Sequence, residues 1–143
     1  MSNDGKDVVR RLIQGMDSGD FGVFEELCSS TYRCHFAGAD TPQDRDEHKA
    51  TAQSIYSAFP DLRHEIHELV AEGDVVALRA TPGGTHEGEF LGIQPTGKKV
   101  QFDVMAFFRI VDGKIQEEWV VADLMGLTQR LRNSWLHPKR TSK

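Results

Sequence analysis

The spacing of apolar residues changes partway along the chain, from a helical period to a strand period. Up to residue 59, apolar side chains recur every three or four positions, which is typical of amphipathic helices. A first helix carries Val8, Val9, Leu12, Ile13 and Met16 and ends before Gly19. Asp20 can cap a short second helix, whose apolar face consists of Phe21, Phe24, Leu27 and Cys28.

A third helix is predicted over residues 44–59, after a short strand at 31–36 and a loop at 38–43. Pro60 ends this helix, because a proline disfavours helical backbone at the residue before it. The inward stripe of the helix consists of His48, Ala52, Ile55, Tyr56 and Phe59.

Beyond Pro60 the residues alternate as in strands. Residues 62–71 and 75–81 are predicted strands joined by a turn at Glu72-Gly73-Asp74, where the glycine supplies a positive φ angle. Pro82-Gly83-Gly84 is expected to interrupt the hydrogen-bond ladder at a bulge or an edge. Residues 85–96 are predicted to form a connection punctuated by glycine and proline.

The clearest hairpin signal lies between residues 100 and 122. Two runs rich in β-branched and aromatic residues flank Asp112-Gly113, a pair favoured in two-residue type I′ turns. This turn predicts a register in which the numbers of facing residues add up to 225. One face then carries Phe102, Val104, Ala106, Phe108, Trp119, Val121 and Asp123. Asp123 would be the single carboxylate in an apolar wall, which would raise its pKa towards the range useful for proton transfer.

Helices followed by antiparallel strands indicate an α+β domain. Because a long, bulged sheet twists and curls, we expect a cone-shaped curved antiparallel sheet with the N-terminal helices covering its concave face. A final helix is predicted at residues 124–131. With 143 residues, the chain is expected to form one domain at 1–131, followed by a basic C-terminal tail at 132–143.

Composition narrows the classes of partner. A formal net charge of −5 argues against nucleic acid or an anionic membrane surface as the main partner. The sequence has no signal peptide pattern and no window with the apolar length of a membrane span, so we expect a soluble, cytoplasmic protein. Cys28 and Cys34 lack C-x-x-C spacing and are expected to be free thiols.

Eight short motifs follow one another between residues 59 and 131. They are Phe59-Pro60-Asp61-Leu62, Ala71-Glu72-Gly73-Asp74-Val75-Val76, Gly84-Thr85-His86-Glu87-Gly88-Glu89-Phe90-Leu91-Gly92-Ile93, Pro95-Thr96-Gly97-Lys98, Phe108-Arg109-Ile110, Asp112-Gly113-Lys114-Ile115, Glu118-Trp119, and Asp123 with Gly126 and Leu127. In this order they resemble the SnoaL-like polyketide cyclase family, which has the α+β fold of nuclear transport factor 2. Thr81-Pro82-Gly83-Gly84 departs from that family, whose members more often continue a strand there with larger side chains.

The resemblance implies an enzyme that closes a ring by intramolecular aldol condensation on a small hydrophobic carbonyl compound, without a metal or cofactor. It also implies that an acidic residue soon after the hairpin tryptophan acts as general acid and base, and this residue is Asp123 here. A second interpretation stays open, because aspartate is a favoured N-cap and a helix is predicted to begin at Leu124.

Further residues are candidates for binding the substrate. The aromatic side chains that would hold it are those of Phe59, Phe102, Phe108 and Trp119. One of three histidines, His35, His48 or His86, would stabilise developing negative charge on oxygen. No metal site is predicted, because the H-E-x-x-H motif is absent and residues three apart in a strand point to opposite faces.

Two other functions remain open. One is an isomerase or hydrolase on the same scaffold. The other is a non-catalytic module for small-molecule binding or dimerisation, which a pocket filled by the protein's own side chains would favour. We also expect a homodimer through an exposed sheet face bearing Met105, Phe107 and Val120, because these apolar side chains need to be covered.

Overall fold

The computed structural model describes residues 2–132, so nearly all of the predicted basic tail lies outside the described residues. Its elements, in chain order, are α1 (Ser2–Asp17), α2 (Val23–Leu27), β1 (Cys28–Phe36), β2 (Gln43–Asp44), α3 (Arg45–Ala58), β3 (Arg63–Glu72), β4 (Val75–Thr85), β5 (Lys99–Gln101), β6 (Val104–Val111), β7 (Lys114–Ala122) and α4 (Leu124–Arg132). The predicted order of helices and strands is confirmed, except that the short strand β2 was not predicted and the first strand of the predicted hairpin is divided into β5 and β6. No described helix is long and apolar enough to cross a membrane.

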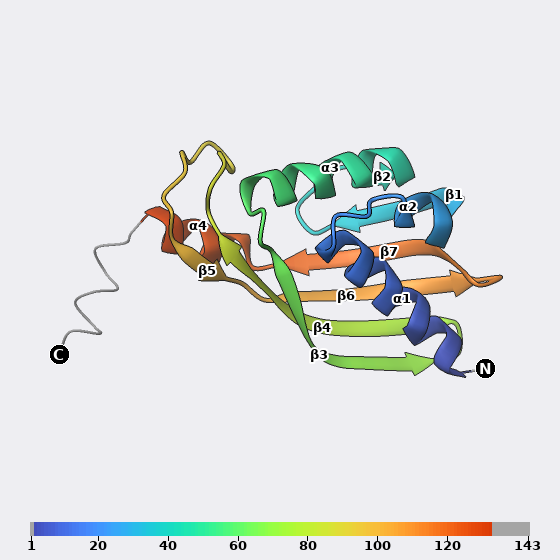
Figure 1. Ribbon diagram of the computed structural model, residues 1–143. Coiled ribbons are helices and arrows are strands. Elements are labelled where there is room, and N and C mark those ends of the chain that lie inside the picture. The colour runs from blue at the N-terminus through green and yellow to red at the C-terminus, as the bar shows by residue number, and fades with distance from the viewer. Residues whose placement is uncertain (1, 133–143) are drawn as a thin grey trace.

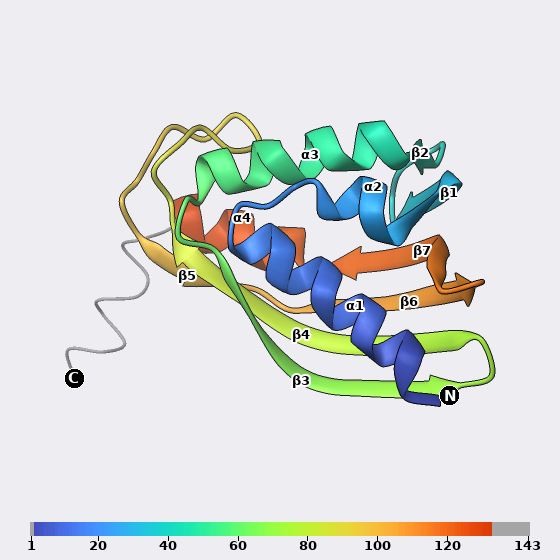
Figure 2. The same cartoon turned by 45° about the vertical axis from the view of Figure 1, so that its right-hand side comes forward.

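The strands form one curved sheet in the order β2-β1-β7-β6-β4-β3, and β5 pairs with the far end of β4. Three helices, α1, α2 and α3, lie over one face of this sheet, and α4 lies at the end where β5 pairs (Figures 1 and 2). The fold is therefore α+β with the N-terminal helices on the concave face, as predicted. The sheet is mixed rather than antiparallel, because β1 runs parallel to β7.

Strand β4 is longer than the pattern indicated. It continues through Pro82-Gly83-Gly84 to Thr85, with Pro82 facing His64 of β3, so the predicted interruption of the ladder is wrong. Strand β4 continues because its partner changes on the side opposite β3. On that side β6 pairs with β4 as far as Ala80, and β5 pairs with it from Gly83. The missing N–H of Pro82 therefore falls between two partner strands.

The predicted start of the third helix is confirmed, but the predicted cap of the second helix at Asp20 is wrong. Helix α2 begins at Val23 with Gly22 as N-cap and no side-chain cap, because Asp20 instead accepts a hydrogen bond from the Gly22 N–H in the turn before the helix. Asp44 caps α3 in a capping box with Glu47, in which each side chain accepts a hydrogen bond from the other residue's backbone N–H. The stripe predicted for α3 faces inward, with His48 and Ala52 buried and Phe59 completely buried just after the helix. This cap and stripe orient His48 towards the sheet.

Apolar side chains gather into two clusters. The larger joins α1, α2 and the concave side of β1, β4, β6 and β7. The smaller lies at the α4 end and consists of Ala58, Phe59, Leu62, Leu127 and Leu131, with six half-buried neighbours. The connection after β4 packs here against the end of α3, where Gly88 N–H donates to the Ala58 carbonyl. A Cβ atom at Gly88 would lie 2.8 Å from the Ser57 carbonyl oxygen, so this approach requires glycine.

A β-bulge changes the predicted register of the β6–β7 hairpin. Asp112 and Gly113 have positive φ angles, as the type I′ turn requires, and Ile110 faces Ile115 as predicted. The next pair is Arg109 with Glu117, so Gln116 is an extra residue on β7. From that point the numbers of facing residues no longer add up to 225.

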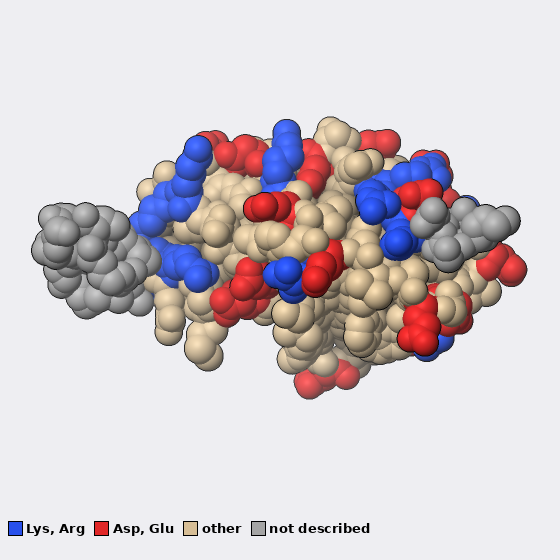
Figure 3. Space-filling model, turned by 90° about the horizontal axis from the view of Figure 1, so that it is seen from below, with Lys and Arg blue, Asp and Glu red and all other residues tan. Residues whose placement is uncertain are grey.

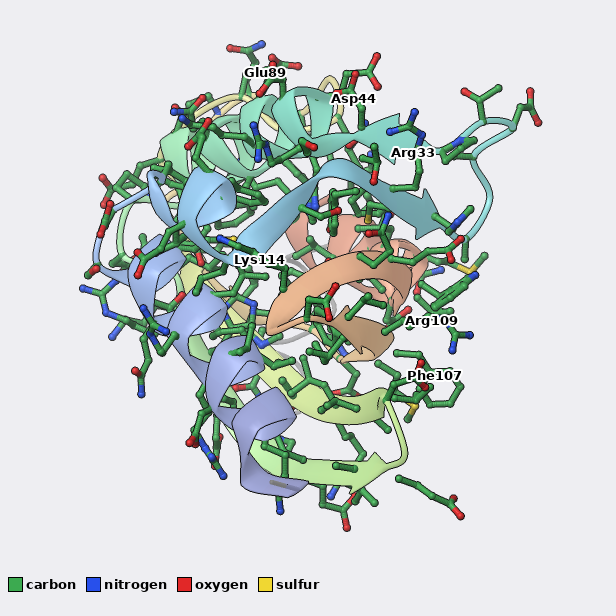
Figure 4. The ribbon with its side chains drawn as sticks, turned by 90° about the vertical axis from the view of Figure 1, so that its right-hand side faces the viewer. Arg33, Asp44, Glu89, Phe107, Arg109 and Lys114 are labelled. Carbon is green, nitrogen blue, oxygen red and sulfur yellow. The ribbon has the colours of Figure 1, made fainter. Side chains whose placement is uncertain are left out.

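Because side chains alternate along a strand, this one-residue shift exchanges the two faces of β7. Glu118 and Val120 lie on the concave face beside Phe108 and Ala106 of β6, whereas Trp119 and Val121 lie on the convex face. The predicted positions of all four β7 side chains are therefore wrong. On β6 the prediction is correct, and Phe107 and Arg109 point away from the helices (Figure 4).

Candidate functional site

The structure places Glu118, rather than Asp123, among apolar side chains on the concave face. Glu118 is 6% exposed and lies in the middle of the sheet, between β1 and β6. Burial raises the pKa of its carboxyl group to about 7, while the hydrogen bond from Tyr32 opposes the rise. Near neutral pH this group can therefore take up and release a proton.

Tyr32 and His48 complete a hydrogen-bonded chain with Glu118. The Tyr32 hydroxyl donates to Glu118 Oε1 at 2.5 Å and lies 2.8 Å from His48 Nδ1. Tyr32, from β1, is completely buried, and burial together with the charge of Glu118 raises its pKa well above the usual value. Burial lowers the pKa of His48 to about 4, so its imidazole is neutral.

The His48 ring is held by aromatic neighbours on three sides. It stacks on Tyr32 with an interplanar angle of 7°, and it meets the rings of Phe24 and Phe36 at their edges. Because helix α3, strand β1 and helix α2 all contribute to this packing, the imidazole orientation is fixed without any contact to a ligand.

Cys34 is the fourth member of this cluster. Its Sγ atom, a ring nitrogen of His48 and a carboxylate oxygen of Glu118 lie within 4.8 Å of one another, a set that resembles a zinc site. The Tyr32 hydroxyl, however, lies within hydrogen-bond distance of both His48 and Glu118 and also interacts with Cys34. Because this hydroxyl already interacts with all three side chains, we interpret the group as a hydrogen-bonded cluster.

The two end members of this hydrogen-bonded group, Glu118 and His48, keep small exposed fractions of 6% and 8%. Within residues 2–132, His86 Nε2 is the buried side-chain polar atom that lacks a hydrogen-bond partner. Nearby inward positions towards α4, Phe36, Val104 and Ala122, are only half-buried. The concave face is therefore covered less completely on the α4 side of Glu118.

Asp123 occupies the position that the alternative interpretation predicted. It is exposed, and its Oδ1 accepts a hydrogen bond of 2.9 Å from the backbone N–H of Gly126 at the start of α4. Asp123 therefore caps this helix. The prediction that it faces the concave side is wrong, because the bulge reverses the faces of β7.

Two of the candidate binding residues lie on the convex face. His35 stacks on Trp119 at a centroid distance of 5.4 Å, and its Nε2 lies 2.7 Å from Glu117. Arg109 covers the Trp119 ring at 5.7 Å. Neither His35 nor Trp119 reaches the concave side, so the structure separates both from Glu118.

The other candidates divide between the two clusters. Phe108 is buried beside Glu118, whereas Phe59 and Phe102 belong to the cluster at the α4 end. His86 stacks on Phe59 there, and its Nδ1 accepts a hydrogen bond from the Thr96 backbone N–H. Of the three candidate histidines, only His48 belongs to the hydrogen-bonded group that contains Tyr32 and Glu118.

The structure is a curved α+β sheet with a buried acid on its concave side, and the comparisons identify the family. The chain belongs to the SnoaL-like polyketide cyclase family, whose model matches residues 6–131. It is 26% identical to the aklanonic acid methyl ester cyclase DnrD of Streptomyces peucetius over 136 residues, which is 93% of this chain and 94% of the relative.

Solved structures agree with this assignment. AclR of Streptomyces galilaeus, a candidate hydroxylase, superposes with a TM-score of 0.84 at 30% identity, covering 92% of this chain and 97% of AclR. IdmH of Streptomyces antibioticus, a candidate polyketide cyclase, has a TM-score of 0.81 at 30% identity and covers 89% and 97%. The chain thus shares its fold and most of its length with proteins related to polyketide cyclases.

Sequence reasoning missed Glu118, although a signal was present. Gln116, Glu117 and Glu118 are three consecutive polar residues in a strand, so either phase of alternation places at least one of them on the apolar face. The hydrophobic pattern could not choose the phase, because Trp119 with Val121 and Val120 with Ala122 are equally apolar alternatives.

Proposed function

We propose that this protein is a cofactor-free cyclase that closes a ring by intramolecular aldol condensation, with Glu118 as general base and general acid. The observation that carries the proposal is the carboxyl group of Glu118 on the concave face, which is the buried carboxyl group among the described residues and has a pKa of about 7. Relatedness to aklanonic acid methyl ester cyclases supports a polyketide with a reactive carbonyl group as the substrate class.

The proposed reaction needs one proton transfer in each direction, because Glu118 first removes a proton from the substrate and later returns it. Glu118 Oε2 removes a proton from the carbon next to a carbonyl group, and the resulting enolate attacks a second carbonyl carbon of the same molecule. A carbon–carbon bond forms, and the new alkoxide takes the proton back from Glu118. Phe36, Val104 and Ala122 are half-buried inward positions further along the sheet towards α4, and an apolar surface there would favour a folded substrate and lower the entropic barrier to ring closure.

A turnover assay tests the proposal. The protein would be incubated with aklanonic acid methyl ester and related open polyketides, and a product of unchanged mass with a new ring would be detected. We expect kcat/KM to rise with pH around a midpoint of about 7, because the base form of Glu118 is needed in the free enzyme. Tyr32→Phe should move this midpoint upward, since the Tyr32 hydrogen bond lowers the pKa of Glu118. A rate that is constant between pH 5 and 8 would contradict the proposal.

One observation favours the non-catalytic alternative. Glu118 is almost completely buried, and one of its oxygens already accepts the Tyr32 hydrogen bond. If the group serves only to hold β1, β7 and α3 together, the protein would bind an apolar small molecule without changing it. Binding of an open polyketide that is recovered unchanged would support this second function.

We also propose that two copies associate through the convex face of the sheet. A groove of about 320 Å³ crosses this face, and among its lining residues are Val70, Met105, Phe107, Trp119 and Val121. Val120, which we had assigned to this face, is buried on the concave side instead. Phe107 and Val121 are each more than half exposed, which is unusual for adjacent apolar side chains on a monomer surface.

Charges at the borders of this groove favour a second copy as the occupant. Glu68 pairs with Arg79 and Asp74 with Arg109, so both signs are present on one face. A two-fold contact needs such a mixture, because each patch meets a rotated copy of itself. In the view along the β3 side, acidic and basic side chains also alternate rather than separating into patches of one sign (Figure 3).

Light scattering would measure this association. We expect a mass of twice 16.0 kDa for the unmodified chain and a mass near 16.0 kDa for Phe107→Glu, because a charge at the centre of the contact would be desolvated. Val111→Glu is the matched control, since Val111 is an exposed apolar residue of β6 that does not line the groove. A monomeric mass for the unmodified chain at high concentration would refute the dimer.

A further inference from the structure

We infer that His48, Tyr32 and Glu118 form a proton relay, in which a proton taken up at His48 Nε2 is delivered to Glu118 through the Tyr32 hydroxyl. The inference rests on the proposed acid–base role of Glu118 and adds a route by which its proton is exchanged. It assigns Tyr32 and His48 as positioning residues that act on the substrate through Glu118.

The hydrogen-bond geometry requires the hydrogen positions on His48, Tyr32 and Glu118 to change together. A hydroxyl group has a single hydrogen, so Tyr32 can donate to Glu118 or to His48 but not to both. When Glu118 is ionised, Tyr32 donates to Glu118 Oε1, and the 2.8 Å contact to His48 is a hydrogen bond only if Nδ1 carries the hydrogen. His48 Nε2 is then the unprotonated nitrogen.

Protonation of Glu118 reverses every bond in the chain. The Glu118 hydroxyl then donates to Tyr32 Oη, Tyr32 donates to His48 Nδ1, and the hydrogen of His48 lies on Nε2. One proton separates the two states: it binds Nε2, the Nδ1 proton moves to Tyr32 Oη, and the Tyr32 proton moves to Glu118 Oε1. No other group gains or loses a proton.

Burial favours this relay over direct exchange between each group and water. The middle member, Tyr32, is completely buried, whereas His48 is 8% exposed and Glu118 is 6% exposed. Each of the end residues has one polar atom that takes no part in the hydrogen bonds to Tyr32, His48 Nε2 and Glu118 Oε2. In the proposed relay a proton enters at one of these atoms and leaves at the other without water reaching Tyr32.

The other titratable groups that face this cluster from the described residues are neutral. Strand β1 contributes Tyr32 and the thiols of Cys28 and Cys34, and burial raises the pKa of all three, so all three stay neutral. Helix α3 contributes His48, which burial keeps neutral. The neighbour from β6 is Phe108, and the neighbour of His48 from α2 is Phe24, so neither strand nor helix adds a charge.

Nitrogen NMR of the full-length protein tests the relay directly. In a ¹⁵N-labelled sample, with His48 assigned by comparison with His48→Asn, we expect a neutral imidazole from pH 5.5 to 8.5. Its hydrogen should lie on Nε2 at the acidic end and on Nδ1 at the basic end, with the same midpoint as the Glu118 carboxyl carbon. One tautomer at every pH, or an imidazolium in this range, would overturn the inference.

Two variants separate the relay from a structural role and from the proposed function. In Glu118→Gln the His48 tautomer should no longer depend on pH, and in Tyr32→Phe it should no longer follow Glu118. The titration of the unmodified protein decides the question even if Tyr32→Phe does not fold. Coupled tautomers without any ring closure would keep the relay and refute the cyclase, whereas ring closure with a fixed tautomer would do the reverse.

Discussion

Glu118→Gln is expected to reduce the rate of ring closure by roughly 10² to 10⁴-fold, the usual contribution of a general acid–base group. Glutamine has nearly the same shape as glutamate and can still hydrogen-bond to Tyr32, so the loss would reflect missing proton transfer rather than missing packing. Rates would be measured at pH 8, where Glu118 of the unmodified protein is ionised. A variant that keeps full turnover would remove Glu118 from the mechanism.

Asp123→Asn is the matched control for this experiment. It makes the same change from acid to amide only five positions along the chain, and asparagine remains a good helix N-cap. Because Asp123 is exposed and bonded to Gly126, we expect nearly unchanged turnover. A large loss of activity in Asp123→Asn, with full activity in Glu118→Gln, would restore the acid that the sequence first indicated.

Stability provides a second control, and the size of the expected effect depends on pH. The pKa of Glu118 is about 7 in the folded protein and 4.5 in the unfolded reference, so the unfolded chain releases the proton first as pH rises. The stability contributed by neutral Glu118 is fully present below pH 4.5 and is lost as pH rises through 7. At 1.36 kcal/mol per pKa unit, Glu118→Gln should be more stable than the unmodified protein by about 3 kcal/mol at pH 8. This difference should vanish in acid, as urea unfolding would show.

Phe59→Ala is expected to lower the free energy of unfolding by about 3–5 kcal/mol, the usual range for a buried phenylalanine. Phe59 is 0% exposed, stacks on His86 and meets Phe90 at the ring edge, and thus holds the connection after β4 against α3. Its removal would leave a cavity that several elements must close together. Urea unfolding at a fixed protein concentration would measure the loss.

Met125→Ala is the control for this cavity. Met125 belongs to α4, which packs in the same cluster, but its side chain is 74% exposed, so its truncation should change stability by no more than about 0.5 kcal/mol. If Phe59→Ala lowered the free energy of unfolding as little as Met125→Ala, packing of Phe59 would not be what stabilises the cluster at the α4 end.

Much of the fold could be predicted because local signals agree with each other. The capping box at Asp44, the positive φ angles at Asp112 and Gly113, and the stop at Gly19 are all properties of a few neighbouring residues. The apolar stripe of α3 depends only on helical periodicity, and it correctly placed His48 on the inner side. These signals determine which elements form and which helix face is buried.

The site itself depended on a single extra residue that no local signal revealed. The sequence predicted a carboxyl group in apolar surroundings, and the bulge at Gln116 gives this position to Glu118 instead of Asp123. A strand with apolar residues in both phases has no preferred face on its own. Packing against β1 and α3 chooses the face, because Tyr32 donates a hydrogen bond to the carboxyl group there and is itself within hydrogen-bond distance of His48.

The sequence alone therefore determined the family, the order of elements and the kind of catalytic group to seek, since each follows from short-range pattern or from motifs in a fixed order. The tertiary structure alone decided which carboxyl group is buried, that β1 lies parallel to β7, and that His48 contacts the acid while His35 and His86 do not. The reason is physical: hydrogen-bond partners and burial come from residues such as Tyr32, 86 positions away from Glu118, and no local pattern encodes that distance.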